Sequence, residues 1–392
     1  MVTVPVHEEW PSAPRELHAV VSAPGPALFR LVGAALGGDG PAILPLSPAL
    51  PAPALRATLD ALRPTHVDGE RREGGVGVPA EVAVVIATSG STGVPKGVQL
   101  SAAALRASAA ASLRRLGARP GERWLCCLPP SHVSGLQVLV RSLLGGTEPI
   151  VHDGFSPEAV LASGADHVSL VPTQLRRLLH ADLSVFRTIL LGGAAAPADL
   201  LAAARAAGAR VVTTYGMSET CGGCVYDGEP LDGVRVGIGD DGRIRLSGPM
   251  LFSGYRLRPD LTGAALDGGW LRTSDLGALE DGRLRVLGRA DDVINTGGEK
   301  VVAAAVAAVV ADHPAVTDAV VVGQPDPEWG ERVVAVVVSP DPPSLAELRA
   351  FVKERLPSYA APARLVVLPE IPLLVNGKPD LEALRYGRVG EP

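Results

Sequence analysis

Hydrophobic and polar residues follow different patterns in three parts of the 392-residue chain. Up to about residue 80, apolar residues recur at helical spacing in two stretches, 27–36 and 53–63, and predict short helices there. The glycine-rich residues 71–81 predict a loop. We find no motif of reactive side chains in this first part, so its sequence predicts secondary structure but no catalytic or binding residue.

The middle part of the chain predicts an α/β fold. Short runs rich in β-branched residues predict buried strands at 82–88, 167–171, 187–193 and 209–216. They alternate with alanine-rich helical patterns such as 101–117, in which Ser101 suits the N-cap and Gly117 the C-terminal stop. Apolar strands separated by helices are typical of largely parallel sheets covered on both faces.

From about residue 231 the pattern becomes hairpin-like, with Asp-Gly pairs between short alternating strands at 241–242 and 281–282. Beyond 289–301 follow a helix at 301–312, a long β run at 319–339 and a second helix at 344–356. We therefore predict a large N-terminal domain over residues 1–289, with mixed or parallel sheets covered by helices. A small C-terminal α+β domain is predicted over residues 290–392.

Composition and charge exclude several classes of protein. Hydrophobic residues make up 47% and charged residues 20%, which is typical of a folded protein. A net charge of −6 argues against nucleic-acid binding. No apolar run approaches the ~20 residues of a membrane span, and the first residues do not resemble a signal peptide. Four cysteines are too few for a disulfide scaffold, so we expect a cytoplasmic protein with reduced thiols.

The strongest local signal is "TSGSTGVPKG" at residues 88–97. Hydroxyls, glycine backbone amides and one cation, Lys96, are what a loop needs to hold a polyphosphate. The lysine carries extra weight because arginine outnumbers lysine 32 to 4. The spacing is not that of a Walker A loop, and the alternative is a flexible surface loop. The predicted phosphate-binding residues are Thr88, Ser89, Gly90, Ser91, Thr92, Gly93 and Lys96.

This loop resembles the phosphate loop of the adenylate-forming superfamily, which includes acyl-CoA synthetases, luciferases and the adenylation domains of peptide synthetases. Further motifs similar to those of the superfamily follow in the same order, at 128–136, 171–179, 190–197, 213–220, 247–255, 268–277, 289–301 and 376–380. The resemblance implies that ATP, Mg²⁺ and coenzyme A are bound. It also implies a shortened N-terminal part, since the phosphate loop starts near residue 88.

The predicted nucleotide-binding residues lie in "TTYGMSET" at 213–220 and in the later motifs. This motif follows a predicted strand, and ligands bind at the carboxyl ends of strands in open α/β sheets. Tyr215 offers a face for adenine, Gly216 permits close backbone approach, and Glu219 suits Mg²⁺. Asp275 and Arg289 resemble the ribose and phosphate contacts of the superfamily. Gly193 and Thr214 complete the predicted nucleotide site. The alternative to metal binding by Glu219 is a solvated surface carboxylate, and the alternative to ribose binding by Asp275 is an aspartate in a turn.

The C-terminal motifs resemble those that carry the two half-reactions. Lys378 in "NGKPD" matches the catalytic lysine of adenylation, and we predict Lys378, Glu219 and Lys96 as the catalytic residues. Asp291 matches the hinge position, which implies a mobile C-terminal domain. Gly297 and Gly298 in "NTGGEK" would leave room for the pantetheine arm of coenzyme A.

The composition of "LPPSHVSGL" at 128–136 limits which acids can be the substrate. It has no carboxylate to hold a substrate ammonium, so an amino acid is disfavoured. The short N-terminal part and "GMSETCGGCVYDGEPLDGV" are most similar to o-succinylbenzoate:CoA ligases of menaquinone biosynthesis, in their actinobacterial form. The predicted pocket residues are His132, Ser169, Thr173, Gly192 and Thr214. For His132 the alternative is a satisfied core histidine.

Other functions stay open at this stage. A CoA ligase for another aryl or medium-chain acid is the closest alternative, and a degenerate binding module is a third. A zinc or redox protein would use Cys221 and Cys224, in C-x-x-C spacing, with the adjacent Cys126 and Cys127. Neighbouring side chains diverge along a strand, so we favour buried packing for the cysteines. The expected partners are small molecules, with a homodimer as one possible assembly.

Overall fold

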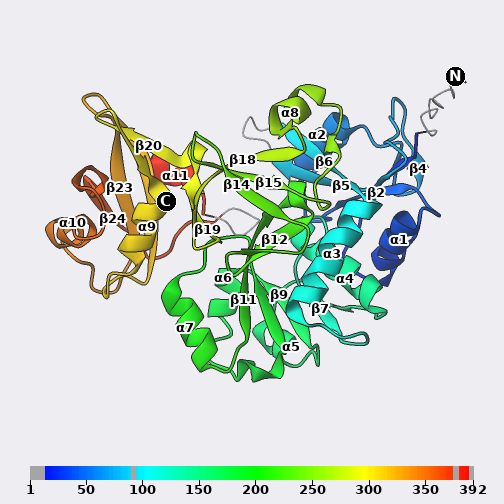
Figure 1. The fold of residues 1–392 in the computed structure, drawn as a ribbon, viewed down its shortest axis with the longest axis horizontal. Coiled ribbons are helices and arrows are strands. Elements are labelled where there is room, and N and C mark those ends of the chain that lie inside the picture. Colours follow the sequence, from blue (N-terminus) through cyan, green and yellow to red (C-terminus); the bar gives the residue numbers. More distant parts are fainter. Residues whose placement is uncertain (1–13, 90–93, 374–378, 388–392) are drawn as a thin grey trace, which may run out of the picture.

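The computed structural model describes residues 14–89, 94–373 and 379–387 (Figure 1). Gly90, Ser91, Thr92, Gly93 and Lys378, all predicted site residues, lie outside the described residues. The predicted fold class is confirmed: a large N-terminal part of sheets and helices carries a small C-terminal α+β part at one end. The exact domain boundary and the mobility of the small part stay predictions.

The first sheet joins the N-terminal segment to the predicted phosphate loop. Its order is β16-β6-β5-β2-β1-β3-β4, with β1, β2 and β5 parallel. The strands are β16 (Gly254–Tyr255), β6 (Pro95–Ser101), β5 (Val82–Ser89), β2 (Ala42–Leu46), β1 (Leu17–Val21), β3 (His66–Val67) and β4 (Glu70–Arg71). Helices α1 (Pro26–Gly37) and α2 (Ala52–Leu62) match the two predicted helices.

Strands β1 and β2 are absent from our predictions. Every residue of β2 is buried, so the strand shows no alternation, and Pro45 interrupts its apolar run. A strand of five residues without alternation is not distinguishable by pattern from a loop or a buried turn. Parallel pairing along the whole of β1 nevertheless places β2 inside the sheet.

The second sheet contains the predicted parallel strands. Its order is β13-β12-β11-β10-β9-β7-β8, and β11, β10, β9, β7 and β8 run parallel. The strands are β13 (Glu229–Pro230), β12 (Gly222–Tyr226), β11 (Val211–Met217), β10 (Thr188–Leu191), β9 (His167–Leu170), β7 (Trp124–Cys126) and β8 (Ile150–Val151). The helices between them are α4 (Val133–Gly145), α5 (Pro157–Leu161), α6 (Pro172–Arg176) and α7 (Ala198–Ala206).

Helix α3 (Ala102–Leu116) has both predicted ends. The Oγ of Ser101 accepts a hydrogen bond of 3.0 Å from the backbone N–H of Ala104, and Gly117 closes the helix in the left-handed region at φ 66°. Both end signals are confirmed, because each satisfies backbone groups that the helix itself leaves unpaired.

The third sheet is antiparallel, with β14 (Arg235–Ile238), β15 (Arg243–Ser247), β18 (Trp270–Glu280), β17 (Leu266–Asp267) and β19 (Arg283–Arg289). Both predicted hairpins are confirmed. Asp281 and Gly282 adopt φ 49° and 77°, as a two-residue turn with left-handed backbone requires. Helix α8 (Pro259–Ala265) precedes β17.

The C-terminal part has its own sheet, in the order β21-β20-β23-β22 with β24 beside β23. The predicted long β run is a hairpin, because Gly330 turns the chain at φ 78°. The elements are β20 (Val293–Thr296), β21 (Glu299–Val302), α9 (Ala303–Ala311), β22 (Asp318–Asp326), β23 (Gly330–Val338), α10 (Leu345–Lys353), β24 (Arg364–Val367) and α11 (Leu381–Arg385). Separate apolar clusters fill this part.

All four cysteines are buried packing residues, as predicted. Each exposes at most 4% of its surface, and burial raises the pKa of Cys126, Cys127 and Cys224 to about 12. Such thiols stay neutral and do not favour metal binding. Within residues 14–89, 94–373 and 379–387, no helix is long and apolar enough to cross a membrane.

Candidate active site

The site begins where β11 leaves the parallel sheet. Residues 211–213 pair with β10, whereas Thr214–Met217 pair antiparallel with β12 instead. The motif "TYGM" is therefore the end of the strand itself and does not follow it, which corrects our prediction. A side chain at Gly216 would overlap the carbonyl oxygen of Gly222, so β12 is the backbone that requires this glycine.

Tyr215, Asp275 and Arg289 come together from three strands. The Tyr215 hydroxyl donates a 2.8 Å hydrogen bond to Asp275 Oδ2, and Arg289 Nη1 lies 3.8 Å from Asp275 Oδ1. Asp275 and Arg289 are also direct partners in the β18–β19 hairpin. Burial and the neighbouring carboxylate raise the pKa of Tyr215, so its hydroxyl stays a donor. The arrangement holds a half-buried carboxylate with oxygens directed between a tyrosine and an arginine.

Glu219 and Lys96 meet through Tyr255. The Tyr255 hydroxyl donates a 2.7 Å hydrogen bond to Glu219 Oε1, and Lys96 Nζ lies 5.8 Å from the centre of the Tyr255 ring. Strand β16 places Tyr255 beside Val98 of β6, close to the end that carries Lys96. A carboxylate and a cation thus share one tyrosine, a combination suited to a metal-bound polyphosphate.

Tyr255 is a site residue that our sequence reasoning missed. It ends the motif "SGPMLFSGY", which we used only as part of the resemblance. Burial and the Glu219 carboxylate raise the pKa of Tyr255, so the hydroxyl remains protonated and orients Glu219. The sequence around Tyr255 does not indicate that its hydroxyl contacts Glu219, because the two residues are 36 positions apart.

Among the predicted acid-pocket residues, Ser169 and Thr214 lie on strands β9 and β11, Gly192 directly follows β10, Thr173 is in α6, and His132 precedes α4. Ser169 is buried on β9, and Thr214 Oγ1 donates a 3.3 Å hydrogen bond to the Leu191 carbonyl. A side chain at Gly192 would overlap Thr214 Oγ1. Thr173 is exposed on α6. His132 is exposed at the N-terminus of α4, so the alternative of a core histidine is wrong.

Arg141 is a second residue that we missed. It exposes only 5% of its surface in the apolar helix α4, and its Nη2 donates a 3.0 Å hydrogen bond to Ser169 Oγ. Its guanidinium carbon lies 4.2 Å from the centre of the Trp124 ring. Among the described residues no carboxylate forms an ion pair with it, and its Nε lacks a hydrogen-bond partner. An arginine in the middle of "VLVRSLLGG" is the signal that could have revealed it.

Gln137 extends this buried polar stripe by one helical turn. Its Nε2 donates a 2.6 Å hydrogen bond to the Cys221 carbonyl, while its Oε1 has no partner among the described residues. Positions four apart lie on the same face of a helix. Helix α4 therefore directs an amide and a guanidinium, neither fully satisfied, toward the second sheet.

In the C-terminal part, Gly297 and Gly298 form the turn between β20 and β21, at φ 59° and 84°. This turn requires glycine by itself, besides any room for a ligand. A Cβ on Gly297 would lie 2.6 Å from the indole ring of Trp329, which is 50% exposed. Asp291 belongs to the short 3-10 helix Ala290–Asp292, and its side chain lies outside the described residues.

Comparison with known families gives two matches. Residues 72–256 match the AMP-binding enzyme family, and residues 305–378 match the AMP-binding enzyme C-terminal domain. Together these cover the strands and loops that carry Lys96, Tyr215, Glu219 and Tyr255.

Individual relatives cover almost the whole chain. A probable 2-succinylbenzoate–CoA ligase of Mycobacterium tuberculosis is 44% identical over 96% of this chain and 99% of its own length. The solved o-succinylbenzoate CoA synthetase of Bacillus subtilis, in complex with its acyl-adenylate intermediate, superposes with a TM-score of 0.82 at 30% identity over 97% of this chain and 90% of that one. The same enzyme has been solved with ATP and a magnesium ion. An amide bond synthetase of Marinactinospora thermotolerans has a TM-score of 0.85 at 29% identity, over 95% and 90% of the two chains.

Proposed function

The chain belongs to the AMP-binding enzyme family, and from this premise we propose that it is an ATP-dependent 2-succinylbenzoate:CoA ligase of menaquinone biosynthesis. The observation that carries the proposal is the 44% identity to the mycobacterial ligase over nearly all of both chains. The described part of the site fits the reaction, because Tyr215 at the end of β11 contacts Asp275, and Glu219 just after β11 contacts Tyr255, which Lys96 approaches.

The reaction has two steps that make different demands on the chain. First, a carboxylate oxygen of the acid attacks the α-phosphorus of ATP, the bond to the β-phosphate breaks, and pyrophosphate leaves. Second, the thiol sulfur of coenzyme A attacks the acyl carbon, the bond to the phosphate oxygen breaks, and AMP leaves. The first step joins two anions, so cations must offset their repulsion. The second needs little base catalysis, because a thiol ionises near pH 8.5.

We assign the nucleotide contacts by their chemistry. Asp275 can accept hydrogen bonds from both ribose hydroxyls, with Tyr215 and Arg289 holding its carboxylate in place. Lys96 suits the phosphates. The half-buried Glu219 fits Mg²⁺, which prefers carboxylate and phosphate oxygens, and the ion would supply charge neutralisation at the phosphates.

We further propose that Arg141 binds the second carboxylate of the acid. 2-Succinylbenzoate carries two carboxylates, of which one is activated and the other stays ionised. Taking an ionised group out of water is costly unless a cation pairs with it. Arg141 offers a buried guanidinium that lacks a carboxylate partner among the described residues and contacts the pocket candidate Ser169. Guanidinium remains protonated even when burial lowers its pKa.

Pyrophosphate release with ATP, Mg²⁺, coenzyme A and a panel of acids tests the proposal. The panel contains 2-succinylbenzoate, substituted benzoates, medium-chain fatty acids and amino acids. We expect 2-succinylbenzoate to give the highest kcat/KM and its CoA thioester to accumulate with AMP. Rapid turnover of another acid without stimulation by 2-succinylbenzoate would refute this substrate and leave a ligase for that acid. Replacing coenzyme A with amines tests amide formation in the same assay.

Replacing Tyr255 with phenylalanine should weaken the use of Mg²⁺ and ATP. The substitution keeps the ring beside Lys96 and removes only the hydroxyl that orients Glu219. A hydrogen bond to a charged group contributes about 1.5–3 kcal/mol, so we expect the Mg²⁺ concentration for half-maximal rate to rise about tenfold. The measurement is pyrophosphate release against Mg²⁺ concentration. Tyr359→Phe, at an exposed position, is the matched control, and equal Mg²⁺ dependence of the two variants would contradict the assignment.

Two further expectations remain proposals. We propose a cytoplasmic enzyme, since both substrates of the first step are metabolites of the cell interior. We also propose a homodimer as one assembly to test, and light scattering of the purified chain in solution measures the oligomeric state directly.

A further inference from the structure

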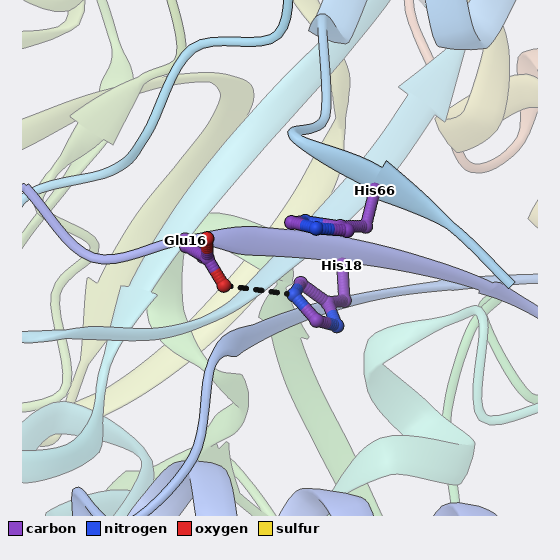
Figure 2. Close-up of side chains that lie close together, drawn as sticks. All are labelled: Glu16, His18 and His66. Atoms are coloured by element: carbon purple, nitrogen blue, oxygen red, sulfur yellow. Dashed lines mark hydrogen bonds and ion pairs between the residues drawn. The ribbon is translucent and has the colours of Figure 1, made fainter. Parts of the chain in front are cut away.

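Three potential metal ligands lie together outside the site described above. Figure 2 shows Glu16, His18 and His66 on one face of the first sheet. His18 of β1 is the direct cross-strand partner of His66 of β3. Glu16 precedes His18 by two residues in extended chain, so both side chains lie on the same face. Among the residues that the structure describes, this is the single group of His, Cys, Asp or Glu side chains close enough to share an ion.

The distances within the group are close to those of a coordination shell. The ligand atoms of the three residues all lie within 4.8 Å of one another, and His18 Nε2 is 3.2 Å from Glu16 Oε2. In a tetrahedral zinc site, bonds of about 2.0–2.1 Å place neighbouring ligand atoms about 3.3 Å apart. The Glu16 and His18 side chains are 62% and 25% exposed, so they can rotate to close the remaining gap.

A neighbouring hydroxyl prepares His66 for coordination. Thr65 Oγ1 donates its proton to the Leu17 carbonyl at 2.9 Å and lies 3.1 Å from His66 Nδ1. With the hydroxyl proton directed to the Leu17 carbonyl, the matching tautomer has Nδ1 as the donor to Thr65. The lone pair of the neutral ring is then on Nε2. Histidine ligands of metals commonly have such a second hydrogen bond, which fixes the tautomer and the ring orientation.

We propose that Glu16, His18 and His66 bind one divalent transition-metal ion, with zinc as the best match. Two imidazoles and a carboxylate suit Zn²⁺, whereas Mg²⁺ and Ca²⁺ prefer oxygen ligands. The ion links β1 to β3, a strand of two residues with few ladder hydrogen bonds. Its role is structural, because an ion that binds only the folded chain stabilises that chain. The site is separate from the nucleotide contacts and does not depend on the proposed function.

Calorimetric titration of the full chain with Zn²⁺ tests this proposal. The chain carries no affinity tag and is treated beforehand with a chelator. We expect one ion per chain, unaffected by excess Mg²⁺, and a higher Tm with Zn²⁺ than without it. His66→Gln should weaken Zn²⁺ binding about 100-fold or more, since loss of an outer-shell partner alone costs about 10- to 100-fold. His180→Gln, at an exposed histidine in the turn after α6, is the matched control and should bind like the wild type.

The structural alternative is a stacked histidine pair with a carboxylate neighbour and no ion. The two rings lie 4.2 Å apart and are tilted by 39°, which is a favourable contact by itself. Equal Zn²⁺ affinity in the wild type and His66→Gln, or no saturable binding by the wild type, would overturn the proposal. Glu16→Gln keeps size and exposure, so it provides the same comparison if His66→Gln fails to fold.

Discussion

Replacing Lys378 with alanine should abolish acyl-adenylate formation while leaving thioester formation from supplied acyl-adenylate intact. The first step brings a carboxylate against a phosphate, and a positioned cation lowers that barrier by offsetting charge as the new bond forms. Removing one such group typically costs about 100- to 1,000-fold in kcat. Pyrophosphate release measures the first step, and conversion of synthetic acyl-adenylate with coenzyme A measures the second.

Lys353→Ala is the matched control for this experiment. Lys353 ends helix α10 on the surface of the same C-terminal part, and we expect its removal to change neither step. A loss of both steps in equal measure with Lys378→Ala would show that this lysine supports the structure and does not act in adenylation alone. The assignment of Lys378 would then be wrong.

Replacing Arg141 with methionine should remove the preference for a dicarboxylic acid. Truncating one partner of a buried charged pair costs about 2–5 kcal/mol, or about 30- to 4,000-fold in kcat/KM. For 4-oxo-4-phenylbutanoate, which lacks the ring carboxylate, the substitution should be neutral or favourable. The measurement is therefore the ratio of kcat/KM for 2-succinylbenzoate to kcat/KM for this analogue, in the wild type and the variant.

Protein stability separates this role of Arg141 from a structural one. Methionine of similar size in place of a buried charge is often neutral or stabilising, so the Tm should not fall. Arg205→Met on the exposed face of α7 is the matched control and should leave the ratio unchanged. An equal loss of activity toward both acids would indicate that Arg141 only packs against Trp124 and positions Ser169.

Most of the fold could be predicted from local pattern. The parallel strands are apolar runs, the hairpins carry Asp-Gly turns, and α3 has the residues that end a helix at both termini. Each of these signals acts within a few residues of its element. The strands that we did not predict include β1, β2, β7 and β8. Every residue of β2 is buried, which removes the alternation, and β7 and β8 have only three and two residues.

The site was predicted as far as residue chemistry and motif resemblance allow. The structure brings Tyr215 to Asp275, and Lys96 toward Glu219, yet the link between the latter two is Tyr255, which no local pattern indicates. Arg141 was missed for a related reason. In the sequence it is one of 32 arginines, and only the fold shows that its guanidinium is buried. Contacts between side chains on strands that are distant in the sequence depend on how the sheets and helices pack together.

In the proposed assignment, helix α4 carries the contact to the acid, and other elements carry the contacts to the nucleotide. The nucleotide-side contacts cross between different sheets, from β11 to β18 and from the turn after β11 to β16, so a change in any of them disturbs a junction of the fold. Arg141, the proposed partner of the second carboxylate, lies instead on one helix of 13 residues, with Gln137 one turn before it. If Arg141 binds the second carboxylate, substitutions in this single helix should change the range of acids and leave the nucleotide contacts intact. For redesign of substrate range, substitutions belong in α4, and the contacts of β11 and its following turn with β18 and β16 should be kept.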